Sequence, residues 1–418
     1  MDAMKNFLLP CAVSSCFLGP LAAQQVHVVD YLSRPGTDFT MLAPAVASAA
    51  DGDILLVRPA PGFRLFASPE DVTIRGKSLR IEADASETSP GGPWPTYIRN
   101  LTISNLPAGG TVVVRGMTLV TPTSVAIEIA NCQGSVWIED CVTEDQDLNF
   151  SPTGVVTVAD SISVVFDGCV LDVERSPTLG PPPALTILRS TLHVFDTEIR
   201  GRDGVETPGS TKGGSAVKLE SGSLFVSGSS LTGGTGALGD FDCDPPNADG
   251  GDALVLSGTA PAAFVQDSVI QGGAGVFGGG CPSGARGLDI VAPVGAVTQL
   301  PGSARRLASR SPVRDDESTS ITFTGSPGDN VYLFWSLRPA PGITSRFFVG
   351  SFLLGTPLHD AQPGTLDPSG SLTFPVRPHE LGPGVEGLSV FAQALFVDPA
   401  GRRFLGSPTH VLLVDASF

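Results

Sequence analysis

The chain has 418 residues, of which 41% are apolar and only 16% are charged, with 50 glycines and 36 prolines. This composition excludes a chain that is disordered for want of apolar residues, and its many turn-forming residues favour short strands over helices. With 42 acidic against 25 basic residues, the net charge of −17 argues against nucleic acid or an anionic membrane as the main partner.

The first 23 residues have the layout of a secretory signal peptide. Lys5 precedes an apolar stretch from Phe7 to Leu21, and small residues follow at Ala22 and Ala23. The stretch is short and broken by prolines, so it is a poor membrane span, and no later run predicts a transmembrane helix. We therefore expect cleavage after Ala23 and a protein that is secreted or lies at the cell surface, in the periplasm or outside the cell.

The same segment has an alternative reading as a lipoprotein signal. Residues 13–16 read Val-Ser-Ser-Cys and resemble a bacterial lipoprotein box, which would leave Cys16 lipidated and the protein tethered to a membrane. The apolar stretch continues past Cys16, and this favours the soluble product.

A repeated unit runs through the middle of the chain, within the predicted β-helix of residues 24–292. Copies of an apolar-x-apolar strand, a two-residue turn and a small residue begin at Ser135, Ser163, Thr191, Ser223 and Ala262, each preceded by a second short strand. These units begin 28, 28, 32 and 39 residues apart. Two or three short strands in each repeat, with no helix between them, predict a parallel β-solenoid in which equivalent positions stack into rows. The predicted inward rows are Ile138, Phe166, Val194, Val226 and Val265, and Cys141, Cys169, Thr197, Ser229 and Ser268. His193 falls at an outward, solvated position.

Residues 38–57 are similar to the opening of secreted right-handed parallel β-helix proteins of the pectin-lyase-like superfamily. Residues spaced for one helix face are Thr40-Met41-Leu42, Ala45-Val46 and Ala49. Gly52-Asp53 matches a turn, and Ile54 to Val57 matches the first strand. The resemblance extends over about residues 26–292 and implies an all-β right-handed β-helix with a short N-terminal capping helix. The superfamily includes lyases, hydrolases and adhesins, so the fold leaves the activity open.

Connections after the repeated unit lengthen along the chain and should form an irregular, acidic ledge. Its sharpest pattern is at Asp240, Asp242 and Asp244, where alternate carboxylates predict a candidate Ca²⁺ site, against the alternative of a solvated acidic turn. Cys243 lies in this loop and Cys281 in the next, so a disulfide between them is plausible in an exported protein. Zinc is improbable because no Cys-x-x-Cys or Cys/His cluster is present.

Arg202 and Asp203 are the candidate catalytic residues. Lyases of the superfamily use an arginine or lysine base opposite calcium-bound uronates, so the resemblance implies Arg202 as the base and Asp203 or Asp242 as a metal ligand. The structural alternative, a local Arg–Asp pair, is favoured because the Asn-Thr-Asp and Gly-His-Gly signatures of the superfamily's hydrolases are absent and the chain's one Asp-Asp lies outside the repeats.

The C-terminal part has a different pattern. Proline-containing residues 293–317 predict a linker, and apolar runs split by Pro/Gly turns predict a small antiparallel β-sandwich over 318–418. This part resembles terminal domains that follow repeats in secreted bacterial proteins. The whole sequence thus indicates an exported, non-catalytic β-helix protein, a rigid binding or structural surface for extracellular polysaccharide or a cell-surface component. The alternative is a calcium-dependent polysaccharide lyase or glycosidase.

Overall fold

The computed structural model describes residues 24–59, 70–84, 88–89, 92–93, 96–120, 125–144, 156–172, 182–204, 211–239, 247–277 and 281–418. The predicted signal peptide, with Cys16, and the loop residues Asp240, Asp242, Cys243 and Asp244 lie outside this part. The described chain is all-β with one helix, α1 (Leu42–Ser48). No helix in this part is long and apolar enough to cross a membrane.

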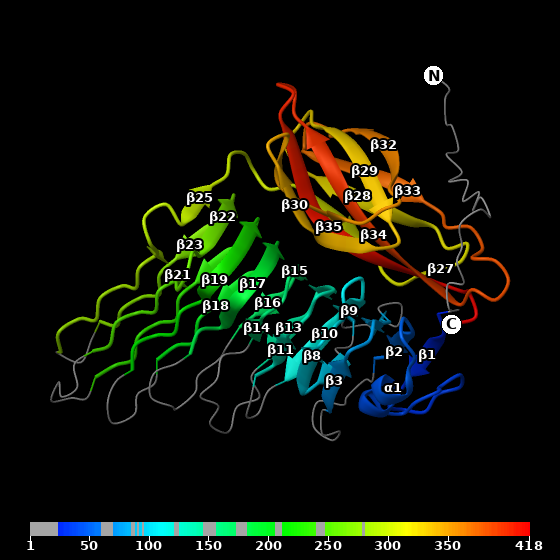
Figure 1. Cartoon of the computed structure of the whole chain (residues 1–418), viewed down its shortest axis with the longest axis horizontal. Helices are drawn as coiled ribbons and strands as arrows, with labels where there is room; N and C mark the ends of the chain where they lie inside the picture. Colours follow the sequence, from blue (N-terminus) through cyan, green and yellow to red (C-terminus); the bar gives the residue numbers. More distant parts are fainter. Residues whose placement is uncertain are drawn as a thin grey trace.

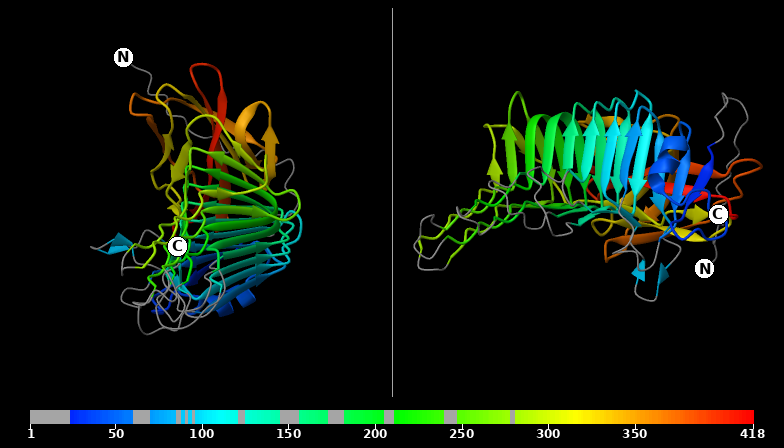
Figure 2. Two further views of the ribbon diagram at one scale, coloured as in Figure 1. Left: turned by 90° about the vertical axis from the view of Figure 1, so that its left-hand side faces the viewer. Right: turned by 90° about the horizontal axis from the view of Figure 1, so that it is seen from below.

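Parallel strands in three rows make up the N-terminal part (Figures 1 and 2). The first row contains β1 (Val26–Val29), β2 (Ile54–Val57), β4 (Leu79–Ala83), β9 (Thr111–Arg115), β12 (Ser135–Glu139), β15 (Ser163–Asp167), β17 (Leu185–Phe195), β19 (Val217–Ser227), β22 (Ala262–Gln266) and β25 (Val297–Gln299). The second contains β3 (Asp71–Arg75), β8 (Asn100–Ser104), β11 (Ile127–Ala130), β14 (Val156–Ala159), the first halves of β17 and β19, β21 (Leu254–Ser257) and β24 (Ile290–Val291).

The third row contains β7 (Thr96–Ile98), β10 (Met117–Val120), β13 (Val142–Glu144), β16 (Val170–Leu171), β18 (Glu198–Arg200), β20 (Ser230–Thr232) and β23 (Val269–Gln271). A separate antiparallel pair, β5 (Thr88–Ser89) with β6 (Gly92–Pro93), lies between β4 and β7 in the chain. Each pass of the chain from β8 to β23 therefore adds one strand segment to each row.

Helix α1 lies at the N-terminal end of the rows (Figure 1). Leu42, Ala45 and Val46 pack into the same apolar core as the inward side chains of the strands. The carboxylate of Glu70 accepts hydrogen bonds from the first helical amides, at 3.1 Å from Leu42 N and 2.8 Å from Ala43 N, and satisfies donors that a helix start leaves unpaired. The predicted helix is confirmed.

The predicted inward row of large apolar residues is confirmed in register and burial, and the predicted row of small residues is buried except for the half-buried Ser268. Ile138, Phe166, Val194, Val226 and Val265 are successive partners across five strands and are 0–1% exposed. The parallel row of small residues is held by polar contacts. The amide of Cys169 donates to Thr197 Oγ1 at 3.2 Å, and the amide of Thr197 donates to Ser229 Oγ at 3.1 Å. Cys132, Cys141 and Cys169 are buried, unpaired thiols.

The segments after β18, β20 and β23 form a regular array, which we call the glycine bundle (201–204, 211–215, 233–239, 247–252, 272–277 and 284–288; Figure 2). Backbone hydrogen bonds link neighbouring outgoing segments, as from Gly201 N to Thr232 O at 2.8 Å. Others connect outgoing to returning segments, from Gly214 N to Arg202 O at 2.7 Å and from Gly234 N to Gly214 O at 2.8 Å. The prediction that these connections form an irregular ledge is therefore wrong for this part of the chain.

Close packing of backbones explains why the bundle needs glycine. A Cβ on Gly234 would lie 1.8 Å from the carbonyl oxygen of Arg202, and one on Gly251 would lie 2.0 Å from the carbonyl oxygen of Gly214. Buried glycines recur at three-residue spacing, as at Gly233 and Gly236, which suits extended chains with three residues per turn.

The C-terminal part has two sheets that share an apolar core, including Phe323, Phe396 and Phe404. One sheet contains β26 (Arg306–Ser309), β28 (Thr319–Thr324) and β33 (Ser371–Val376). The other contains β27 (Val313–Arg314), β29 (Asn330–Ser336), β30 (Pro339–Ser345), β31 (Phe348–Leu354), β32 (His359–Thr365), β34 (Gly387–Val397) and β35 (Arg403–Val414). The expected linker 293–317 contains three strands. β25 pairs with β22 in the first row, whereas β26 and β27 pair within the C-terminal sheets.

The C-terminal sheets cover the outward face of the first row. Trp137 contacts Phe391 edge-on at 4.9 Å between ring centroids, and Phe225 and Leu353 belong to the same apolar cluster. The expectation of a solvated His193 is wrong: its side chain points out of the sheet but is 3% exposed, beside Gly342 of β30. Burial lowers its pKa to about 4.

Candidate functional site

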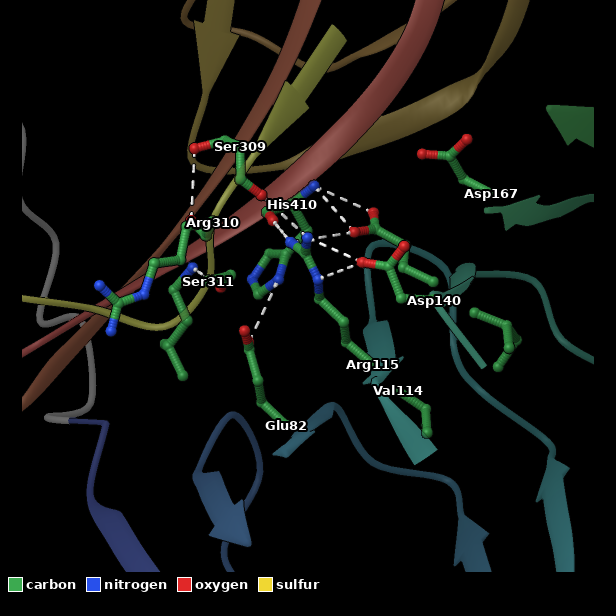
Figure 3. A network of polar contacts seen from close by, with 12 residues as sticks. Glu82, Val114, Arg115, Asp140, Asp167, Ser309, Arg310, Ser311 and His410 are labelled. Carbon is green, nitrogen blue, oxygen red and sulfur yellow. Dashed lines mark hydrogen bonds and ion pairs between the residues drawn. The ribbon is translucent and has the colours of Figure 1, made fainter. Parts of the chain in front are cut away.

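A row of ionisable side chains crosses the contact between the parallel strands and the C-terminal sheets. Glu82, Arg115, Glu139 and Asp167 occupy the same position on β4, β9, β12 and β15, so they stack as neighbours in register. His410 of β35 faces this row (Figure 3). Parallel pairing therefore brings one cation and three carboxyl groups together against the second part of the molecule.

Arg115 is the centre of the network (Figure 3). Its guanidinium pairs with Asp140 Oδ2 at 2.8 Å and lies 3.5 Å from Glu139 Oε2. It also donates to the carbonyl oxygens of His410 and, at 3.0 Å, Ser309. One side chain of the parallel rows thus satisfies two backbone acceptors of the C-terminal sheets.

The carboxylate of Glu139 completes this contact. The amide of His410 donates to Glu139 Oε1 at 2.9 Å, while the His410 ring lies 3.7 Å from Glu82 Oε2. Burial raises the pKa of Glu139 to about 8 and that of Glu82 to about 7, although the attraction of Arg115 opposes both shifts. Burial, with the positive charges of Arg115 and Arg80, lowers the pKa of His410 well below its usual range. Both carboxyl groups and the imidazole therefore favour their neutral forms.

A cavity of about 650 Å³ opens beside this network. Arg115, Asp140, Asp167, Arg306, Ser309 and Thr409 are among its lining residues. Burial raises the pKa of Asp167 well above its usual range, and the negative charges of Glu139 and Asp196 add to the shift, while Arg306 opposes it. The cavity therefore places Asp167, a carboxyl group with a raised pKa, beside the guanidinium groups of Arg115 and Arg306.

Arg202 and Asp203 lie in the glycine bundle, away from the polar row. Arg202 is 4% exposed, and its carbonyl oxygen accepts the hydrogen bond from Gly214. Asp203 pairs with Arg200 at 3.2 Å and accepts a hydrogen bond from Thr235 N at 2.7 Å. These contacts link neighbouring segments of the bundle.

The predicted metal and disulfide residues fall largely outside the described chain. Asp240, Asp242, Asp244 and Cys243 are not described; Cys281 is described and is disulfide-bonded. Among the described residues, no group of three or more His, Cys, Asp or Glu side chains has a metal-binding arrangement.

Sequence reasoning missed Glu82, Arg115, Glu139 and His410. A signal was available, because Arg115, Glu139 and Asp167 each end an outward-facing strand at the same place in the repeat. Charged side chains stacked at one position of a buried parallel strand need a partner from elsewhere in the fold. His410 carried no such local signal.

No protein-family model matches the chain. No curated protein matches it either. Among solved structures, the chain is similar to a superoxide reductase (neelaredoxin) from Ignicoccus hospitalis, with 11% sequence identity, a TM-score of 0.16, and a match covering 26% of this chain and 80% of that one. A TM-score of this size carries no argument about fold or function.

Proposed function

We propose that the chain is an exported, non-catalytic right-handed parallel β-helix protein of the pectin-lyase-like superfamily. Residues from 24 to the end of β25 form its solenoid, the strands from β26 onward form its C-terminal β-sandwich, and the first 23 residues direct export. The solenoid serves as a rigid extracellular surface for polysaccharide or another cell-surface component. The protein is secreted or lies at the cell surface, and lipidation at Cys16 is the less favoured route of attachment.

The three rows of parallel strands support the solenoid assignment. Like residues recur at one position in successive passes, as with Ile138, Phe166 and Val194, and helix α1 covers the N-terminal end. Stacked passes of this kind bury a continuous core only through their neighbours, which makes a long and stiff body.

The burial of the ionisable network carries the non-catalytic part of the proposal. Glu82, Glu139 and His410 have shifted pKa values, a common mark of active sites, yet they are 0–1% exposed and contact one another across the two parts of the chain. Groups that a substrate cannot reach stabilise a fixed arrangement of the two parts.

The test is a combined binding and turnover assay. Purified protein is incubated with insoluble and soluble acidic and neutral polysaccharides, with and without Ca²⁺, while bound protein, new reducing ends and absorbance at ~235 nm from elimination products are followed. We expect retention on at least one polysaccharide without product. Turnover that scales with enzyme concentration, or retention on none of them, contradicts the proposal.

A calcium-dependent polysaccharide lyase or glycosidase is the second candidate, favoured by Asp167 and Asp140, two carboxyl groups that line one cavity and of which Asp167 has a raised pKa. This function predicts product formation that Asp167→Asn abolishes. A lyase that instead uses Arg202 as its base, with Ca²⁺ at Asp203, Asp240, Asp242 or Asp244, predicts loss of eliminative product with Arg202→Ala or a chelator. Calcium-dependent melting without turnover would assign the ion a structural role.

A further inference from the structure

A second cavity, of about 640 Å³, lies where the far end of the first row meets the C-terminal sheets. Phe225 of β19 and Phe264 of β22 line it on one side. The turn between β30 and β31 and the start of β35 line the other side, with Arg346, Phe347 and Arg403 among their residues. It lies apart from the ionisable network, and no residue lines both cavities.

The charge of this cavity is opposite to that of the protein. Its lining includes Arg346, Arg402 and Arg403 and no acidic residue, although the whole chain carries 42 acidic against 25 basic residues. Arg402 pairs with Asp398 at 2.7 Å. Arg346 and Arg403 are exposed, and neither makes an ion pair with another described residue. Two guanidinium groups are therefore available to an anion.

The same arginines lie beside aromatic rings. Phe347 is 63% exposed, and the Arg346 guanidinium carbon lies 5.0 Å from its ring centroid. Phe404 is flanked by Arg305 at 4.4 Å and Arg402 at 5.7 Å. The exposed ring of Phe347 presents a flat apolar face, and such a face suits the C–H face of a sugar ring.

We propose that this cavity binds an anionic sugar, a uronic acid or a sulfated residue, within a short segment or at the end of an extracellular polysaccharide. Arg346 and Arg403 bind the carboxylate or sulfate through bidentate hydrogen bonds, and Phe347 packs against the sugar ring. The net charge of −17 repels a long polyanion, so contact limited to this cavity is favoured over binding along the whole molecule. This inference depends on the proposed function and specifies its substrate class.

The test is calorimetric titration of the full protein with four probes: tetragalacturonate, a sulfated tetrasaccharide from heparin, neutral cellotetraose and a short single-stranded DNA. We expect at least one anionic tetrasaccharide to bind and cellotetraose and DNA not to bind. Arg346→Ala and Arg403→Ala each weaken binding about tenfold, since each removes a charge-assisted contact. Phe347→Ala weakens it as well, and ~0.5 M NaCl reduces it through screening.

Arg377→Ala is the matched control, because Arg377 is a 65% exposed arginine of the C-terminal part outside the cavity. Equal affinity in the wild type, Arg346→Ala and Arg403→Ala overturns the inference, as does equal binding of the neutral tetrasaccharide. Tighter binding of DNA reassigns the cavity to a different ligand. If no tetrasaccharide binds, this inference alone is overturned. The proposed function still stands if the protein is retained on polysaccharide without turnover and these variants do not change that retention.

Discussion

Glu139 shows how a single side chain can connect two parts of a protein and make the connection depend on pH. Its carboxylate accepts the amide of His410 at 2.9 Å and lies 3.5 Å from the guanidinium of Arg115. With Glu139 protonated, these contacts are buried hydrogen bonds, which add little net stability, but the loss of either partner leaves a buried polar group unsatisfied. Their main effect is therefore to fix how β12 and β35 lie against each other.

Glu139→Gln tests the titration of this group. Burial raises the pKa of Glu139 from 4.5 to about 8, so the folded protein holds a proton that the unfolded chain releases between these values. Stability from this proton is complete below pH 4.5 and is lost as the pH rises through 8. Glutamine keeps an oxygen for the His410 amide and cannot titrate. We expect the Tm of the variant to fall less than that of the wild type between about pH 5 and 8.

Calorimetry across this pH range measures the effect, and Glu128→Gln, at an exposed position on β11, is the control. Parallel Tm curves for the wild type and Glu139→Gln would mean that Glu139 is already ionised in the folded protein.

At the scale of elements, the glycine bundle differs from the strands beside it. The strands bury apolar side chains, whereas the bundle joins extended backbones by hydrogen bonds such as that from Gly251 N to Gly234 O at 2.7 Å. Each of these close approaches leaves no room for a side chain. The bundle is therefore sensitive to the smallest substitutions.

Gly234→Ala should disrupt the bundle, since the new methyl group would lie 1.8 Å from the carbonyl oxygen of Arg202. Relief requires backbone movement, and we expect a cost of about 3 kcal/mol in the local opening free energy. Hydrogen exchange of the amides of Gly234 and Gly251 measures this cost. Gly295→Ala is the control, because the new methyl group would meet nothing within 4 Å and only the φ of +79° opposes it. It should cost about 1 kcal/mol and leave hydrogen exchange in the bundle unchanged. Unchanged exchange at Gly251 would contradict the packing described here.

The sequence predicted the strands far better than the bundle, for a physical reason. Inward positions such as Ile138 and Phe166 must be apolar in every pass, so the requirement is visible as a repeat. In the bundle, hydrogen bonds between backbone groups hold the segments together, so the sequence needs only small residues at the close contacts. Irregular loops have the same composition. The regular array after β18, β20 and β23 was consequently expected to be irregular.

At the scale of the whole molecule, the two parts meet in two buried apolar clusters and the ionisable network between them. Trp137, Phe225 and Leu353 pack in one cluster, and Arg314 of β27 pairs with Asp84 at 2.8 Å beyond β4. The parallel rows would expose a line of large apolar side chains if the C-terminal sheets were absent. We infer that neither part is independent of the other in solution.

Phe391→Ala tests this dependence, because Phe391 is fully buried against Trp137 at the centre of the contact. Loss of a buried phenylalanine costs about 3–5 kcal/mol. We expect the wild type to melt in one calorimetric transition and the variant to melt earlier, with the C-terminal sheets separating first. Phe277→Ala, at a 77% exposed phenylalanine of the glycine bundle, is the control. Two transitions in the wild type would show that the parts unfold independently.

This contact could not be predicted from the sequence. Arg115 and His410 are 295 positions apart, and nothing near either residue specifies the other. The outward position of His193 was predicted correctly from the strand pattern, but its solvation was not, because the layer that covers it comes from a separate part of the chain. Local periodicity determines which face of a strand a side chain occupies, whereas long-range docking determines whether that face meets water.

The side-chain-free interior of the glycine bundle also affects how it responds to cold. Apolar burial weakens on cooling, since it depends on the hydration of hydrocarbon and gives unfolding a large positive heat capacity. Contacts such as that from Gly273 N to Gly251 O at 2.8 Å bury peptide groups instead. Opening the bundle therefore carries a small heat-capacity change, and it should keep its order at low temperatures where the strand core has begun to lose stability.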